Sequence, residues 1–68
     1  MSDYTPKGGW NAVFSQKDRQ RCTAYYYYIE RKHGPIIAEM MSQMILYKEK
    51  YHLTYSEEQE EKIARVFR

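Results

Sequence analysis

Apolar residues recur at intervals of three and four in three segments of this chain, which is the spacing of amphipathic helices. The first segment runs from Asn11 or Ser15 to His33. Ser15 followed by Asp18 matches a capping box with the shorter acid, and the Gly-Pro pair at 34–35 ends the helix. The pattern predicts one long helix before that pair.

Four consecutive tyrosines, Tyr25 to Tyr28, lie inside this first helix. Its predicted inner face carries Cys22, Tyr25, Tyr26, Ile29 and His33. Residues 23–29 are also rich in strand-forming types, so a strand is the competing interpretation. Helix-forming flanks and the lack of a hairpin turn favour the helix.

The second helix is expected to begin at Pro35, because proline suits the first helical position. Its apolar arc covers nearly half of the circumference, more than one neighbour covers, and consists of Ile36, Ile37, Met40, Met41, Met44, Ile45, Tyr47 and Tyr51. Leu46 lies on the otherwise polar side, and we expect it to be exposed. Met41, Ile45 and Leu46 are therefore the candidate oligomer interface, with the methionines otherwise serving as core or as an adaptable groove.

The third helix is expected to start at Thr54 or Ser56, since each begins a capping-box pattern. Its inner stripe is Ile63, Val66 and Phe67. The acidic run 57–61 matches the positive end of the helix dipole, or alternatively masks the basic first helix. The whole pattern predicts an all-α, compact three-helix bundle: a single helical domain over 11–68, with a flexible N-terminal arm over 1–10.

The arm contains one proline and two glycines and shows no periodicity. Trp10, Val13 and Phe14 are too apolar for a free tail, and we expect them to fold back as a lid over the core. The alternative makes Trp10 an anchor for a partner, because tryptophan is enriched at interface hot spots.

Length and composition limit what the chain does. A domain of 68 residues has a small core and usually needs a staple such as a disulfide, a metal or a partner subunit. Cys22 is the only cysteine and the histidines are His33 and His52, too few for a disulfide or a four-ligand zinc site. We expect no metal and no cofactor, and a homodimer or a dedicated protein partner as the staple.

We expect the chain to be cytoplasmic, and its charge pattern indicates little about a partner. The net charge is +2, with +3 in residues 1–34 and −1 in residues 35–68, a modest footprint for nucleic acid. Neither a secretory signal nor an apolar run of membrane-spanning length is visible, and a lone cysteine suits a reducing compartment.

The outer side of the first helix pairs tyrosines with cations. Tyr27 precedes Arg31 by four residues and Tyr28 precedes Lys32 by four, so each cation lies within reach of a ring. The candidate partner-binding residues are Trp10, Tyr27, Tyr28, Arg31 and Lys32. Such a surface suits a protein partner or unpaired bases, whereas the plain alternative is tyrosines lying flat over their neighbours.

No catalytic pattern is visible. Cys22 and His33 lie about 16 Å apart along one helix, too far for a nucleophile and its base. No helix opens like the recognition helix of a helix-turn-helix protein. We expect a non-enzymatic regulatory or inhibitory protein that binds a protein partner, and its small size suggests a phage or mobile-element origin. The alternatives are a nucleic-acid-binding protein and a homo-oligomeric structural subunit.

Overall fold

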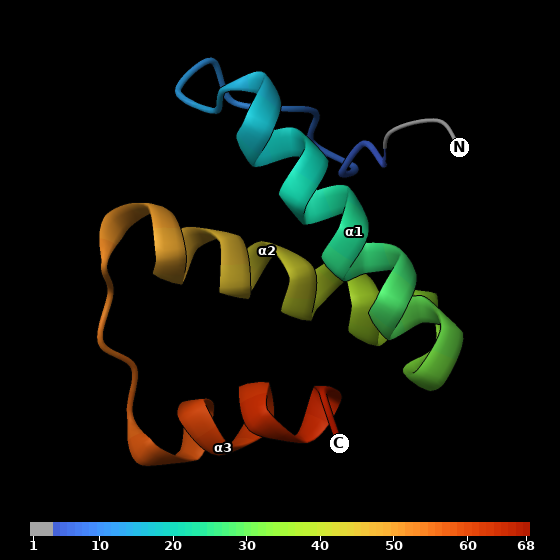
Figure 1. The fold of residues 1–68 in the computed structure, drawn as a ribbon, viewed down its shortest axis with the longest axis vertical. Helices are drawn as coiled ribbons and strands as arrows, with labels where there is room; N and C mark the ends of the chain where they lie inside the picture. The colour runs from blue at the N-terminus through green and yellow to red at the C-terminus, as the bar shows by residue number, and fades with distance from the viewer. Residues whose placement is uncertain (1–3) are drawn as a thin grey trace.

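Three α-helices make up the structure, a computed structural model that describes residues 4–68 (Figure 1). They are α1 (Gln16–His33), α2 (Pro35–Tyr51) and α3 (Glu57–Val66), and residues 4–68 contain no strand. The predicted all-α, three-helix fold is confirmed, and residues 23–29 are helical. In Figure 1, α1 crosses the first half of α2 to form a packed hairpin, and α3 runs back beside α2 with fewer contacts.

Capping boxes decide where two of the helices begin. The Ser15 hydroxyl accepts a hydrogen bond from the Asp18 N–H, and the Asp18 carboxylate accepts one from the Ser15 N–H. Ser56 and Gln59 make the same reciprocal pair before α3. Each pair satisfies two backbone donors that a helix start leaves free. The later of the two predicted starts is therefore the observed one in both helices.

A single residue, Gly34, joins α1 to α2. Its N–H donates to the Glu30 carbonyl at the end of α1, and its own carbonyl accepts from the Ala38 N–H at the start of α2. Its backbone has φ 90° and ψ 168°, a region that only glycine adopts without strain. Because Pro35 then occupies the first position of α2, the chain reverses without a loop.

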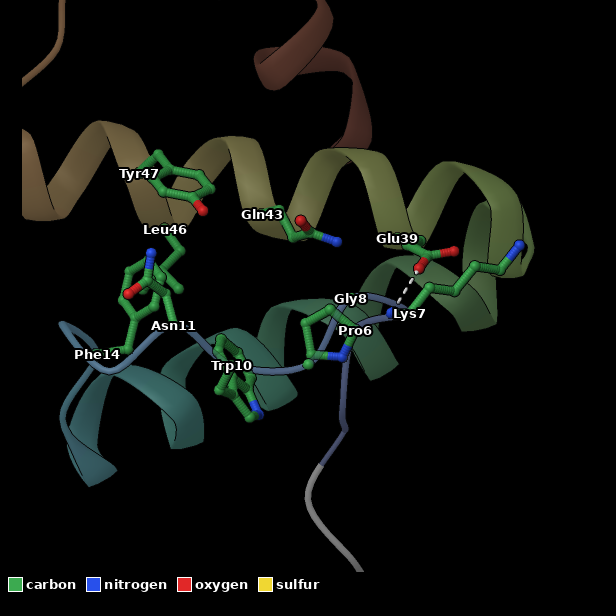
Figure 2. A pocket seen from close by; sticks show the side chains of 11 residues that line it. Pro6, Lys7, Gly8, Trp10, Asn11, Phe14, Glu39, Gln43, Leu46 and Tyr47 are labelled. Carbon is green, nitrogen blue, oxygen red and sulfur yellow. Dashed lines mark hydrogen bonds between the residues drawn. The ribbon is translucent and has the colours of Figure 1, made fainter.

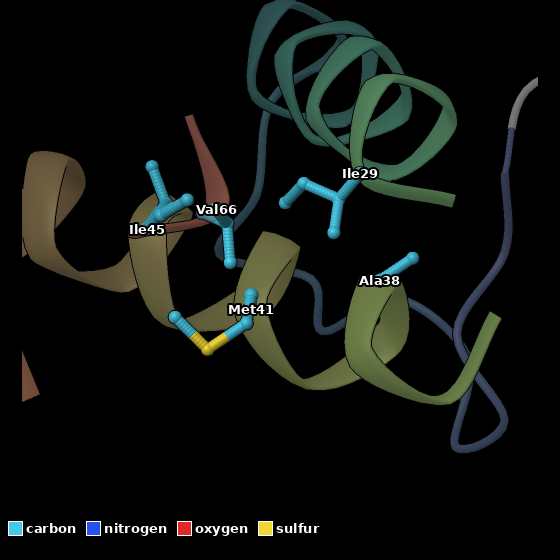
Figure 3. Close-up of a cluster of buried hydrophobic side chains, with 5 residues drawn as sticks. All are labelled: Ile29, Ala38, Met41, Ile45 and Val66. Atoms are coloured by element: carbon cyan, nitrogen blue, oxygen red, sulfur yellow. The ribbon is translucent and has the colours of Figure 1, made fainter. Parts of the chain in front are cut away.

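The core consists of two clusters, and each contains side chains of both α1 and α2. The first joins all three helices and contains Ile29, Ala38, Met41, Ile45 and Val66 (Figure 3). The second contains Phe14, Cys22 and Leu46, with Tyr4 and Trp10 packed against it. The segment before α1 thus supplies part of the core.

The expected exposure of Leu46 is wrong. Its side chain is 1% exposed, because Phe14 covers the side of α2 that looks polar in the sequence. Met41 and Ile45 are buried in the first cluster. The three residues predicted as an oligomer interface therefore lie inside the folded chain, where a second copy does not reach them.

The arm, described from Tyr4 onward, lies against the helix pair. The Tyr4 ring stacks on Tyr26 with centroids 3.8 Å apart. The backbone N–H of Tyr4 donates a hydrogen bond to the Thr23 hydroxyl. Phe14 is buried as the predicted lid, whereas Val13 is exposed. The flexibility of the arm stays a prediction, and residues 1–3 lie outside the described part of the chain.

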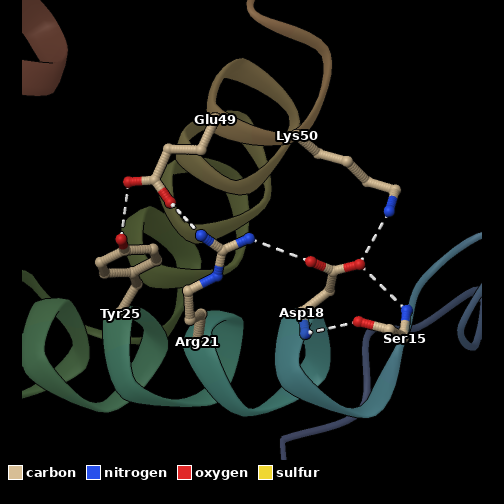
Figure 4. A network of polar contacts seen from close by, with 6 residues as sticks. All are labelled: Ser15, Asp18, Arg21, Tyr25, Glu49 and Lys50. Atoms are coloured by element: carbon tan, nitrogen blue, oxygen red, sulfur yellow. Dashed lines mark hydrogen bonds and ion pairs between the residues drawn. The ribbon is translucent and has the colours of Figure 1, made fainter.

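A polar network ties α1 to α2 beside the core (Figure 4). Asp18, 6% exposed, accepts hydrogen bonds from Lys50 Nζ at 2.8 Å and from Arg21 Nη2 at 2.9 Å. Arg21 also reaches Glu49, which accepts a 2.6 Å hydrogen bond from the Tyr25 hydroxyl. The bond from Lys50, followed by that from the Ser15 backbone, holds the pKa of Asp18 well below its usual range.

Within residues 4–68, none of the helices combines the length and the apolar character that crossing a bilayer requires.

Candidate functional site

Side chains from both ends of the chain pack against the tyrosine run. On one side of α1, Tyr4 stacks on Tyr26, and Tyr26 meets Tyr27 edge to face at 5.4 Å. On the other side, Phe67, which follows α3, lies 6.4 Å from the Tyr25 ring. The first three tyrosines of the run are half-buried, and the fourth is 38% exposed. The four tyrosines therefore do not all face one core, as expected for consecutive aromatic residues in a helix.

The C-terminal end of α1 forms an exposed aromatic and basic surface. The Tyr28 ring stacks on Phe67 with centroids 5.7 Å apart, and both side chains are exposed. Lys32 Nζ lies 4.8 Å from the Tyr28 ring centroid and donates a hydrogen bond to the Tyr28 hydroxyl. The predicted Tyr28–Lys32 pairing is confirmed. We call Tyr27, Tyr28, Arg31, Lys32 and Phe67 the α1-end surface.

Arg31 is exposed and has no ion-pair partner among residues 4–68. The acids of α3 pair elsewhere: Glu60 with Lys48, and Glu61 with Arg65 and Arg68. Within residues 4–68, no acid of this run forms an ion pair with α1. The alternative that the run masks the basic first helix through ion pairs is therefore wrong. The α1-end surface keeps its positive charge available.

Trp10 lies away from the α1-end surface. Its ring meets Phe14 edge to face at 5.8 Å, just before α1 begins. From Gln16 to Tyr28 is about 18 Å along the helix axis. The structure thus brings together four of the five predicted partner-binding residues and places Trp10 with the core at the other end of α1.

Beside Trp10, the arm and α2 enclose a hollow (Figure 2). Its wall includes Pro6, Trp10, Phe14, Glu39, Gln43 and Tyr47. Glu39, the single carboxylate among its lining residues, accepts a hydrogen bond from the Lys7 N–H. The wall therefore offers no pair of carboxylates for acid–base chemistry.

An apolar stripe on α2 is the surface that the sequence interpretation missed. Ile36 is 77% exposed and Met40 61%, and the face continues through partly exposed side chains to the C-terminal end of the helix. The α2 stripe consists of Ile36, Ile37, Met40, Met44, Tyr47 and Tyr51. Met44 is only partly exposed and also packs against the first cluster, and Tyr47 meets Phe14 edge to face at 5.3 Å. The signal was the width of the apolar arc, which exceeds what one neighbour covers. The pattern did not show which part of the arc the rest of the chain leaves uncovered.

The residues with potential for chemistry are dispersed. Cys22 is fully buried, and burial raises the pKa of its thiol, which suits a packing residue better than a nucleophile. His33 ends α1, and His52 caps α2 in the left-handed conformation. Residues 4–68 hold no group of three histidine, cysteine or acidic side chains placed to bind a metal. The non-enzymatic interpretation stays a prediction.

Searches for related proteins found no match to a family model, to a curated protein or to a solved structure. The fold defines a small all-α protein, a helical hairpin with a third helix beside it. Two exposed surfaces, the α1-end surface and the α2 stripe, distinguish it.

Proposed function

We propose that this chain is a small regulatory or inhibitory protein that binds a protein partner through the α1-end surface. The observation that carries the proposal is the exposed Tyr28–Phe67 ring pair, with Lys32 over Tyr28. One turn after Tyr28 lies Arg31, which forms no ion pair within residues 4–68. Tyrosine and arginine are the residue types that dominate binding energy at protein interfaces.

The geometry supports a partner with an apolar pocket rimmed by acids. The Tyr28 and Phe67 rings, whose planes are inclined at 29°, form an exposed apolar surface from both α1 and the segment after α3. Arg31 and Lys32 lie in the last turn of α1, so cations border these two rings on one side. Rings that are already held in place lose little side-chain freedom on binding, which favours affinity.

A capture experiment tests this function. The wild-type chain, a Tyr28→Ser/Arg31→Ser variant and a Lys17→Ser/Gln20→Ser control are immobilised and exposed to the same lysate. The control residues are exposed on α1 near its other end. A protein retained by the wild type and the control but lost by the first variant supports the proposal, once circular dichroism shows all three folded. Equal retention by all three chains contradicts it.

Nucleic acid is the second candidate, because Arg31 has no acidic partner in the described chain and lies beside an exposed ring. Cations would contact phosphates, and Tyr28 would stack on an unpaired base. Fluorescence anisotropy with labelled single- and double-stranded oligonucleotides decides between the two candidates. Binding that weakens steeply with salt, and less steeply in Arg31→Ala, favours nucleic acid. No binding at low salt leaves the protein partner.

A further inference from the structure

We infer that the α2 stripe is a self-association surface, on which a second copy of this chain packs its own α2 in the antiparallel direction. This site is separate from the α1-end surface and does not depend on the function proposed for it. Three features of the stripe favour self-association: its area, its lack of charge and the order of residue types along it.

The exposed area of the stripe is about what each copy contributes to a small specific interface. Its five most exposed side chains, Ile36, Ile37, Met40, Tyr47 and Tyr51, are between 37% and 77% exposed. Together they present about 500 Å² of surface, the size of the largest apolar patch on a typical monomer. Two copies packed on it would remove about 1,000 Å² from water, the least that a specific interface requires.

The charged residues of α2 lie outside the stripe and are already bonded within the chain. Glu39 accepts from the Lys7 N–H, and Lys48 pairs with Glu60. Glu49 and Lys50 belong to the network around Arg21 and Asp18. An uncharged face offers a charged partner nothing to pair with, whereas an identical uncharged face matches it without leaving a buried charge unpaired.

The order of residue types favours the antiparallel direction. Ile37, Met40, Met44, Tyr47 and Tyr51 follow one another at alternating spacings of three and four, the pattern of a helix–helix seam. Its first half is aliphatic and its last part aromatic. Antiparallel packing places the isoleucines and Met40 of one copy against the tyrosines of the other, where a thioether gains from contact with a ring. It also opposes the two helix dipoles.

Sedimentation equilibrium tests the association. The wild type should have twice its 8.3 kDa chain mass, and Met40→Glu, which places a charge on the stripe one turn before its central residue, should weaken association at least tenfold. Ala24→Glu is the matched control, because Ala24 is an exposed small residue on α1, outside the stripe. It should remain dimeric. A monomeric wild type, or a Met40→Glu chain as dimeric as the control, overturns the proposal.

Engineered cysteines test the direction, since the native Cys22 is fully buried. In the antiparallel pair, position 44 lies near the two-fold axis, whereas the two copies of position 36 are about 24 Å apart along the helix axes. A disulfide needs Cα atoms within about 7 Å. Met44→Cys should therefore form a cross-linked dimer on mild oxidation, and Ile36→Cys should not. Equally efficient cross-linking at both positions shows parallel helices and overturns the antiparallel arrangement.

Discussion

The two faces of α2 are built from the same residue types and have opposite surroundings. Its inner face places Met41, Ile45 and Leu46 in the core, each at most 5% exposed. Its outer face holds Ile36, Met40 and Tyr51 in solvent. The neighbours of a helix, rather than its own apolar pattern, therefore decide which part of a wide apolar arc is core and which is free for a partner.

The largest expected effect contrasts a truncation on each face. Leu46→Ala should lower the free energy of unfolding by about 2–4 kcal/mol, because it leaves a cavity between Phe14 and Cys22. Met40→Ala should change the free energy of folding the single chain by less than about 0.5 kcal/mol. Urea denaturation measures both, at concentrations low enough to keep the chain monomeric. Equal losses would mean that the two faces do not differ in burial.

The second prediction concerns Gly34, the joint between α1 and α2, whose conformation sets which face of α2 packs on α1. Gly34→Ala should cost about 1–3 kcal/mol, since φ 90° with ψ 168° is strained for any residue with a side chain. No atom lies within 4 Å of the position that the new Cβ would take, so the cost is purely conformational. Gly8→Ala, at a position without positive φ, is the control. Equal thermal midpoints for the two variants would show that the joint tolerates a side chain.

The third prediction tests the network that fastens the inner face. The pKa of Asp18 is lowered in the folded chain, so its charged form stabilises the fold above the unfolded pKa of about 4. This contribution is lost as the pH falls below that value. Asp18→Asn should therefore be less stable at neutral pH and should lose less stability on acidification, measured by thermal melts from neutral to acidic pH.

Lys50→Gln sharpens this test, because it removes the hydrogen bond that lowers the pKa of Asp18 the most. It should keep only part of the wild-type pH dependence. A wild-type profile in both variants would rule out the network as the source of acid sensitivity.

The smallest expected effect concerns the pKa of Tyr25, the tyrosine of the run that is hydrogen-bonded to the network between α1 and α2. Burial, then the hydrogen bond to Glu49, raises the pKa of Tyr25 to about 12. Its neutral form is favoured in the fold, so the stabilisation is complete below the unfolded pKa of about 10 and is lost as the pH rises toward 12. An absorbance titration of tyrosinate should show one late-ionising group fewer in Tyr25→Phe. An unchanged count of late groups would contradict this assignment.

Local chemistry made the helices predictable. Ser15 with Asp18 and Ser56 with Gln59 are reciprocal caps within four residues, and Gly34-Pro35 ends one helix and starts the next. These signals act through neighbouring residues alone, so they are visible in the sequence. The pairing of Tyr28 with Lys32 was predictable for the same reason, as the two lie one turn apart.

The site was only partly predictable, because its residues meet through long-range contacts. Phe67 joins the α1-end surface from the other end of the chain. Trp10 packs beside Phe14 and lies apart from the tyrosines with which it was grouped. Leu46 was expected in solvent because its helix neighbours are polar, and the segment before α1 covers it instead.

Three helices, their caps and a tyrosine run with cations one turn away could all be predicted from the sequence, since these follow from backbone geometry and residue spacing. Tertiary contacts place Leu46 in the core, add Phe67 to the α1-end surface and leave Ile36 and Met40 of the α2 stripe exposed. The physical reason is that an amphipathic pattern states how much of a helix is apolar, whereas burial depends on which distant segments pack against it.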